Sequence, residues 1–121
     1  LTGQARRPVH GDKDRLEQVF TNLLTNAIKY SPEADHVNLY IDTCESAVIV
    51  RVRDYGIGIP KDVQKHIFER FYRVQGVRDN NFPGLGMGLY IVEAIVKRHS
   101  GQISVESEEG EGSTFSVTLP Y

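Results

Sequence analysis

The stretch that decides the fold is RLEQVFTNLLTNAIKYSP, residues 15–32. Its apolar residues recur three and four positions apart, and this spacing predicts an α-helix with one buried face. They are Leu16, Val19, Phe20, Leu23, Leu24, Ala27 and Ile28. We expect the helix to run from about residue 13 to residue 30, because Pro32 pushes the residue before it out of the helical region.

A polar stripe follows the same predicted helix, beside the apolar one. Its members lie three or four residues apart, so their side chains stack along one side. They are Gln18, Asn22, Asn26, Lys29 and Tyr30. A solvated helix face is the ordinary interpretation of such a stripe. Asparagine is a poor residue inside a helix, however, so Asn22 and Asn26 in register favour a second role, as side-chain oxygens near a hard cation.

Composition limits the possible partners. The chain has 121 residues, 40% of them hydrophobic and 25% charged, which predicts one globular domain over residues 1–121. The net charge of -2 argues against nucleic acid or an anionic membrane as a partner. No apolar run is long enough for a membrane span and no signal peptide is recognisable, so a soluble, cytoplasmic domain is expected.

Two further features concern the single cysteine and the ends of the chain. Cys44 has no second cysteine to pair with, which excludes an internal disulfide, and we expect it to be a small buried residue.

The chain starts abruptly with LTGQARRPVHGDKD and ends in a strand-like TFSVTLPY. Both ends predict a fragment of a longer protein.

Periodicity and turn residues predict the other elements in chain order. An extended segment is expected at 8–10, strands at 36–43, 47–53, 102–108 and 113–119, and helices at 61–67 and 87–99. Asp12 or Asp14 is the predicted N-cap of the first helix, and Gly101 the predicted C-cap of the last. The fold class is therefore α/β: a two-layer sandwich with helices on one face of a mixed, mainly antiparallel sheet.

Two glycine-rich segments indicate where a ligand binds. DYGIGIP, residues 54–60, follows a strand, and its glycines permit close backbone approach or positive φ. GLGMGL, residues 84–89, precedes a helix, so its backbone amides lie at the positive end of a helix dipole and can bind an anion. No strand precedes Gly84 and no Lys-Ser or Lys-Thr pair follows Gly88, which excludes the Rossmann and Walker fingerprints.

The order of these motifs resembles a known family. The asparagine helix, DYGIGIP, IFERFYR at 67–73 and GLGMGL are similar to the N, G1, F and G2 boxes of the ATP-binding catalytic domain of bacterial sensor histidine kinases. The resemblance covers about residues 11–119. It implies the Bergerat-type ATP-binding fold, which DNA gyrase B, the Hsp90 chaperones and MutL share.

The resemblance also implies roles for single residues. Asn26 matches the Mg²⁺ ligand, and Asn22 lies beside it near the metal and phosphates. Lys29 matches a phosphate-binding lysine, Tyr30 a ring packed by the nucleotide, and Asp54 the carboxylate that accepts a hydrogen bond from the adenine amino group. Such an acceptor selects adenine, because guanine presents a carbonyl oxygen there.

The remaining family positions surround the same nucleotide. Gly56, Gly58 and Ile59 would lie against base and sugar, and Thr114 near the adenine pocket. The triphosphate would be bordered by Gly84, Leu85, Gly86, Met87, Gly88 and Leu89, with Arg73, and secondarily Arg70, aimed at the phosphates. Residues 74–83 would form a lid, with Phe68 and Phe71 packed in the core. Leu85 departs from the serine or threonine of many relatives.

The implied function is a kinase. The domain would bind Mg²⁺-ATP and donate the γ-phosphate to a histidine on a separate dimerisation and phosphoacceptor hairpin, in two-component signal transduction through a response regulator. Asn22, Asn26, Lys29 and Arg73 would carry catalysis. The isolated domain is expected to be a monomer without direct membrane contact. The chain's own histidines, His10, His36, His66 and His99, lack the family's acceptor motif, so we expect them to be structural.

Three alternatives remain. An ATPase of the gyrase, Hsp90 or MutL kind would carry a glutamate in place of Asn22 to activate water, and an amide cannot accept that proton. A related anti-sigma serine kinase is disfavoured by IFERFYR and the long lid. A degenerate nucleotide-binding module or scaffold is disfavoured because all the implied metal and base contacts are present.

Overall fold

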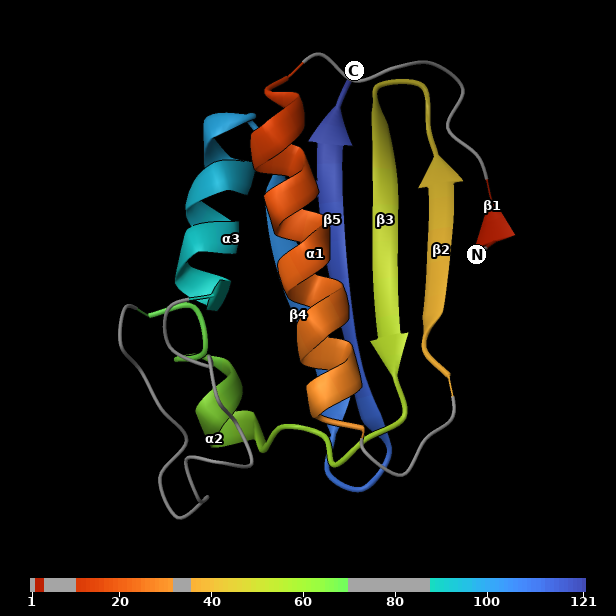
Figure 1. The fold of residues 1–121 in the computed structure, drawn as a ribbon, viewed down its shortest axis with the longest axis vertical. Coiled ribbons are helices and arrows are strands. Elements are labelled where there is room, and N and C mark those ends of the chain that lie inside the picture. The colour runs from red at the N-terminus through yellow and green to blue at the C-terminus, as the bar shows by residue number, and fades with distance from the viewer. Residues whose placement is uncertain (1, 4–10, 32–35, 70–87) are drawn as a thin grey trace.

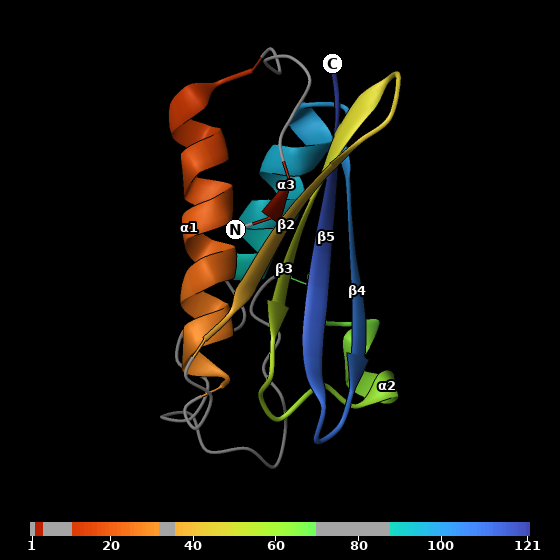
Figure 2. The same cartoon turned by 90° about the vertical axis from the view of Figure 1, so that its right-hand side faces the viewer.

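The computed structural model describes residues 2–3, 11–31, 36–69 and 88–121 (Figure 1). The strands are β1 (Thr2–Gly3), β2 (Asn38–Thr43), β3 (Ala47–Asp54), β4 (Gln102–Glu108) and β5 (Gly112–Pro120). The helices are α1 (Lys13–Lys29), α2 (Lys61–Gln64) and α3 (Gly88–Arg98). Figure 2 shows α1 and α3 side by side on one face of the sheet, while the short α2 lies near the end of β4.

The described strands form one sheet in the order β1-β2-β3-β5-β4. The short β1 pairs with β2 in parallel, and every other neighbouring pair is antiparallel. The predicted mixed, mainly antiparallel sheet with helices on one face is therefore confirmed. Within the described residues, no helix is both long and apolar enough to cross a membrane.

Cross-strand rows on the helix-facing side of the sheet are apolar except for the last one. The core rows are Val50, Val117, Ile103 and Val52, Phe115, Val105, and the last row is Asp54, Ser113, Ser107. Because side chains alternate along a strand, these last residues face the same side as the core. The helix-facing side thus ends in a polar row at the end of the sheet where β3 stops.

The helix α1 begins where Asp12 accepts hydrogen bonds from the backbone amides of Asp14 and Arg15, so Asp12 is the N-cap. Its buried residues are Val19, Leu23, Asn26 and Ala27. The prediction that Ile28 is a core residue is wrong, since its side chain is 65% exposed. An i, i+4 row turns by about 40° at each step, so Ile28 has rotated away from the sheet.

The end of α3 differs from the prediction in one residue. Gly101 donates its amide to the carbonyl of Val96 at 2.9 Å, and Ser100 donates to Lys97 at 3.0 Å, which is the Schellman arrangement. Its left-handed position is therefore taken by Ser100, with φ 60°, and not by Gly101. Gly101 has a different reason to be glycine: a Cβ there would lie 2.3 Å from the Thr118 carbonyl oxygen.

Smaller differences concern α2 and Cys44. The α-helix predicted over 61–67 ends at Gln64, and the chain continues through turns with shorter-range hydrogen bonds, such as the His66 amide to the Val63 carbonyl at 2.9 Å. Cys44 is exposed in the β2–β3 turn, where no core lies against it, so its predicted burial is wrong. The extended segment predicted at 8–10 lies outside the described residues.

Candidate functional site

Four elements meet at one end of the molecule. The end of α1, the end of β3, the β4–β5 turn and α2 all lie at the lower end in Figure 1. Residues 55–60, which we call the G1 loop, lead from β3 to α2 across this end. The polar row of Asp54, Ser113 and Ser107 lies directly beneath it.

The glycines of the G1 loop are required by close backbone contacts. A Cβ on Gly56 would lie 1.8 Å from the Tyr30 carbonyl oxygen, at the end of α1. Gly58 has φ 75°, and a Cβ there would lie 2.0 Å from the carbonyl oxygen of Glu108. The amide of Ile57 also donates to the Tyr30 carbonyl at 3.2 Å. The G1 loop backbone therefore comes close to α1 at Gly56 and to the β4–β5 turn at Gly58.

Asp54 is a buried carboxylate with one oxygen left for a ligand. Its side chain is 3% exposed, and Oδ1 accepts from the amides of Gly56 at 3.1 Å and Ser113 at 3.2 Å. No donor in the described part of the chain bonds to Oδ2. Burial raises the pKa of the Asp54 carboxyl, while those two amides and Arg53 oppose the shift. Asp54 is thus a hydrogen-bond acceptor that is held in one orientation and shielded from solvent.

Asn26 carries a buried polar atom to which no described residue bonds. The residue is 7% exposed, and its Nδ2 has no hydrogen-bond partner among the described residues. Such an atom is costly in a folded protein unless a ligand, ion or water satisfies it. Turning the amide by 180° exchanges its oxygen and nitrogen, so either atom can face a ligand. A site for a cation or a phosphate fits this residue.

The other predicted residues of α1 lie around Asn26. Asn22 is half-buried one turn earlier, and Lys29 is exposed in the last turn. Tyr30 is buried at the C-cap, and burial raises the pKa of its phenol. Ser31 donates its hydroxyl to the Ala27 carbonyl, which closes the end of the helix. The helix thus brings Asn22, Asn26 and Tyr30 to the end of the molecule where Asp54 lies.

The start of α3 offers backbone amides. The first amides of a helix have no partner within it, and α3 begins at Gly88. Among the described residues, no atom lies within 4 Å of a Cβ built on Gly88. Leu89 is 1% exposed in the core, which leaves only its amide for a ligand. An anion fits this helix terminus.

Several predicted residues lie outside the described part of the chain. They are Arg70, Phe71, Arg73, Gly84, Leu85, Gly86, Met87 and the lid at 74–83. Phe68, in contrast, is described, and its ring packs edge-on against that of Phe115 with centroids 6.4 Å apart. The predicted core role of Phe68 is confirmed.

The predicted place of Thr114 near the adenine pocket stays a prediction, and the strand register fixes only the face on which Thr114 lies. Thr114 pairs with Arg53 and therefore lies on the face opposite to Asp54. Ser113 is the residue beside Asp54: the two are cross-strand partners, and Ser113 is 5% exposed. The alternation of β5 contains this signal, since Phe115 is an apolar residue of the same parity as Ser113. A shift of one residue along a strand exchanges the two faces.

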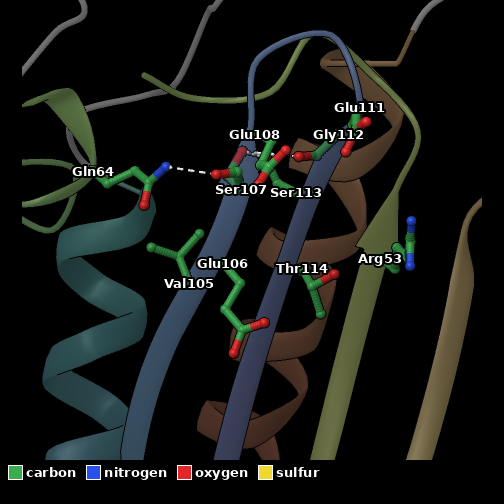
Figure 3. Close-up of a pocket in the computed structure, with 10 residues that line it drawn as sticks. All are labelled: Arg53, Gln64, Val105, Glu106, Ser107, Glu108, Glu111, Gly112, Ser113 and Thr114. Atoms are coloured by element: carbon green, nitrogen blue, oxygen red, sulfur yellow. Dashed lines mark hydrogen bonds between the residues drawn. The ribbon is translucent and has the colours of Figure 1, made fainter. Parts of the chain in front are cut away.

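Two other residues of the site were not predicted. The Ser107 hydroxyl accepts from the Ile59 amide at 2.7 Å and donates to the Gly112 carbonyl at 2.9 Å. Gln64 donates to the Ile59 carbonyl at 2.7 Å and to the Ser107 carbonyl at 3.0 Å, and Figure 3 shows the second of these bonds. Both residues line a polar hollow of about 360 Å³ together with Ser113. They fasten the G1 loop to β4.

Comparison with known proteins identifies this arrangement. Residues 11–121 match the family of histidine kinase-, DNA gyrase B- and HSP90-like ATPases. The sensor histidine kinase WalK of Bacillus subtilis (strain 168) is 45% identical over 112 residues, which cover 91% of this chain and 18% of WalK. The sensor histidine kinase RppB of Synechocystis is 42% identical over 110 residues, 91% of this chain and 24% of RppB. The chain thus spans about a fifth of these relatives.

Solved structures agree with the sequence relatives. A mycobacterial sensor histidine kinase, MprB, superposes with a TM-score of 0.82 at 32% identity, over 93% of this chain and 76% of that one. Full-length ShkA in complex with AMPPNP gives a TM-score of 0.79 at 32% identity, over 93% of this chain and 22% of ShkA. The chain therefore belongs to the histidine kinase-, DNA gyrase B- and HSP90-like ATPase family, and within it is similar to the catalytic domains of sensor histidine kinases.

Proposed function

We propose that this chain binds Mg²⁺-ATP and donates the γ-phosphate to a histidine on a separate phosphoacceptor hairpin. The hairpin would belong to the parent sensor kinase, and a response regulator would take the phosphate from it, in the cytoplasm. In the transfer, an imidazole nitrogen bonds to the γ-phosphorus as the bond to the β,γ-bridging oxygen breaks and ADP leaves. On its own the chain would be a monomer.

The observation that carries this proposal is the state of Asp54. A carboxylate that is 3% exposed has its Oδ1 fixed by two amides and its Oδ2 without a donor in the described residues. A buried acceptor of this kind suits a ligand with an N–H donor, such as the amino group of adenine. ShkA, a structural neighbour, is described in complex with AMPPNP, an adenine nucleotide analogue.

Asn26 supports the triphosphate end of the proposal. With its amide turned so that the oxygen faces the ligand, Asn26 would hold Mg²⁺, which in proteins is bound by few protein oxygens together with substrate phosphates. When bound, Mg²⁺ neutralises charge on the transferring phosphate. Asn22 is an amide and cannot serve as a general base toward water, which favours a kinase over a hydrolase. Lys29 and Arg73 would add positive charge toward the phosphates.

The described histidines support an acceptor outside this chain. His99 accepts from the Asp12 amide at 3.0 Å and donates to the Ile95 carbonyl at 2.8 Å. His66 bonds to Glu69 at 3.0 Å, and the ring of His36 packs against that of Tyr55. Each of the three thus has a structural contact with another residue of the chain.

Calorimetric titration with ATP, with and without Mg²⁺, tests the proposal. We expect Mg²⁺-dependent binding by the wild type and losses of about tenfold or more for Asn26→Ala and Asp54→Asn, because each removes a polar contact to the ligand. Thr25→Ala, an exposed neighbour on α1, is the matched control and should bind like the wild type. The proposal would be refuted if the wild type did not bind ATP, or if both site variants bound ATP as tightly as the wild type.

Phosphate transfer separates the kinase from the ATPase. Labelled ATP is mixed with this chain and the parent's helical hairpin, and the hairpin should then carry acid-labile, base-stable phosphate. Release of inorganic phosphate without transfer would indicate an ATPase instead. Label on serine or threonine would indicate the serine kinase alternative.

A further inference from the structure

The Ser107 hydroxyl makes three hydrogen bonds beneath the G1 loop. Its neighbours are the Ile59 amide nitrogen at 2.7 Å, the Gly112 carbonyl oxygen at 2.9 Å and the Ser113 hydroxyl oxygen at 2.7 Å. Figure 3 shows Ser107 and Ser113 side by side on neighbouring strands. A serine hydroxyl has one proton and two acceptor positions, so this arrangement uses all of its capacity.

The direction of each bond follows from the partners. An amide N–H can only donate, so Ile59 takes one acceptor position of Ser107. A carbonyl can only accept, so Gly112 takes the single Ser107 proton. The remaining bond must then run from the Ser113 hydroxyl to Ser107. Ser113 has thereby used its own proton and keeps only lone pairs for any further partner.

A second set of bonds holds this arrangement in place. Gln64 donates from one nitrogen to the carbonyls of both Ile59 and Ser107. The Ser113 amide donates to Asp54 Oδ1, so its proton too is directed away from a ligand. Counting bonds to the described residues, Asp54 and Ser113 each retain an acceptor, and no side chain of the row retains a donor.

We propose that Ser107 is a positioning residue for base selectivity: it fixes the Ser113 hydroxyl as an acceptor beside Asp54, so that the row excludes guanine. This inference rests on the proposed function. An adenine amino group offers N–H donors to the row, whereas the carbonyl oxygen of guanine would meet acceptors without a proton. Ser107 acts through Ser113 and need not touch the nucleotide.

The variant Ser107→Ala tests this role by releasing the Ser113 proton. Ser113 could then donate to a carbonyl oxygen, so the ratio of ATP to GTP affinity should fall about tenfold. Ser107→Thr keeps the hydroxyl, so its ratio of ATP to GTP affinity should equal that of the wild type. Ser104→Ala is the matched control, because Ser104 lies on β4 with its side chain on the opposite face, and it should keep the wild-type ratio.

A double variant distinguishes a directed proton from a loosened loop. If the freed Ser113 proton accounts for the change, Ser107→Ala combined with Ser113→Ala should lose the gain in GTP binding. Thermal unfolding of each variant verifies that the fold is intact. Equal losses of ATP and GTP affinity in Ser107→Ala, or a GTP gain that persists in the double variant, would overturn the inference.

The outcome for the wild type separates this inference from the proposed function. A wild type that binds neither nucleotide overturns both. A wild type that prefers ATP, with the same preference in Ser107→Ala, leaves the proposed function standing and overturns the role of Ser107 alone.

Discussion

The buried carboxylate of Asp54 suits the proposed binding of ATP but lowers the stability of the fold. Its carboxylate is buried, and its pKa is raised chiefly because water is excluded from it. The native state therefore holds the Asp54 proton to higher pH than the unfolded state does. The stability that this group contributes is complete below its ordinary pKa near 3.8 and is lost as pH rises through the raised native value.

Asp54→Asn should consequently stabilise the fold at neutral pH while it weakens ATP binding. The amide oxygen of asparagine can still accept from Gly56 and Ser113, and no charge is buried. The gain in unfolding free energy should vanish below about pH 3.8 and reach its full value above the native pKa of Asp54. Denaturant unfolding across this pH range measures it, with the exposed Asp42→Asn as control. A loss of stability at pH 7 would contradict the argument.

At the residue level, parity along the strands was the information that sequence reasoning left unused. Asp54 and Ser107 are the last inward residues of β3 and β4, whereas Ser113 is the first inward residue of β5; on each strand the inward apolar residues share this parity. The motif resemblance predicts Asp54 and Thr114 as ligand residues, and the strand register adds Ser113 as the cross-strand partner of Asp54. Ser107 and Gln64 were not predictable in this way, because their roles depend on hydrogen bonds between segments far apart in the chain.

At the level of elements, the long periodic segments were predicted well. The helix expected over 13–30 is observed at Lys13–Lys29, and the strand expected over 102–108 at Gln102–Glu108. Short elements were less predictable, since α2 has one turn and β1 has two residues. Such elements depend on tertiary contacts more than on propensity. The exposure of Ile28, at the end of the apolar stripe, likewise depends on tertiary packing, because it is decided by where the sheet ends.

The C-cap of α3 carries the second prediction. Ser100 has φ 60°, a region that costs a residue with a Cβ about 1–2 kcal/mol. Glycine avoids that cost but gains flexibility in the unfolded chain, worth about 0.5–1 kcal/mol. Ser100→Gly should therefore stabilise the fold by about 0.5–1 kcal/mol, measured by denaturant unfolding.

Ser46→Gly is the matched control for the C-cap prediction. Ser46 is also an exposed serine in a turn, but among the described non-glycine residues only Ser100 has a positive φ. Ser46→Gly should thus lose stability by about 0.5–1 kcal/mol, because only the unfolded-state term remains. Equal effects of the two substitutions would show that the left-handed geometry of Ser100 carries no cost.

At the scale of the whole molecule, the site belongs to no single segment. Asn26 comes from α1, Asp54 from β3, Ser107 from β4 and Ser113 from β5. The close contacts at Gly56 and Gly58 join the G1 loop to α1 and to the β4–β5 turn. A nucleotide that contacts the row and α1 together can therefore bind only when both layers are assembled.

This dependence gives the last prediction, that Mg²⁺-ATP stabilises the molecule globally. At a free ligand concentration of 100 times Kd, the unfolding free energy should rise by about 2.7 kcal/mol, since the unfolded chain does not bind. Hydrogen exchange should then slow about 100-fold at the most protected amides of β3 and β5, including those remote from the site, because these exchange through global unfolding. Asn26→Ala at the same ligand concentration should show much less slowing. Protection confined to the G1 loop and the end of α1 would instead mean that the site can form while the rest of the sheet opens.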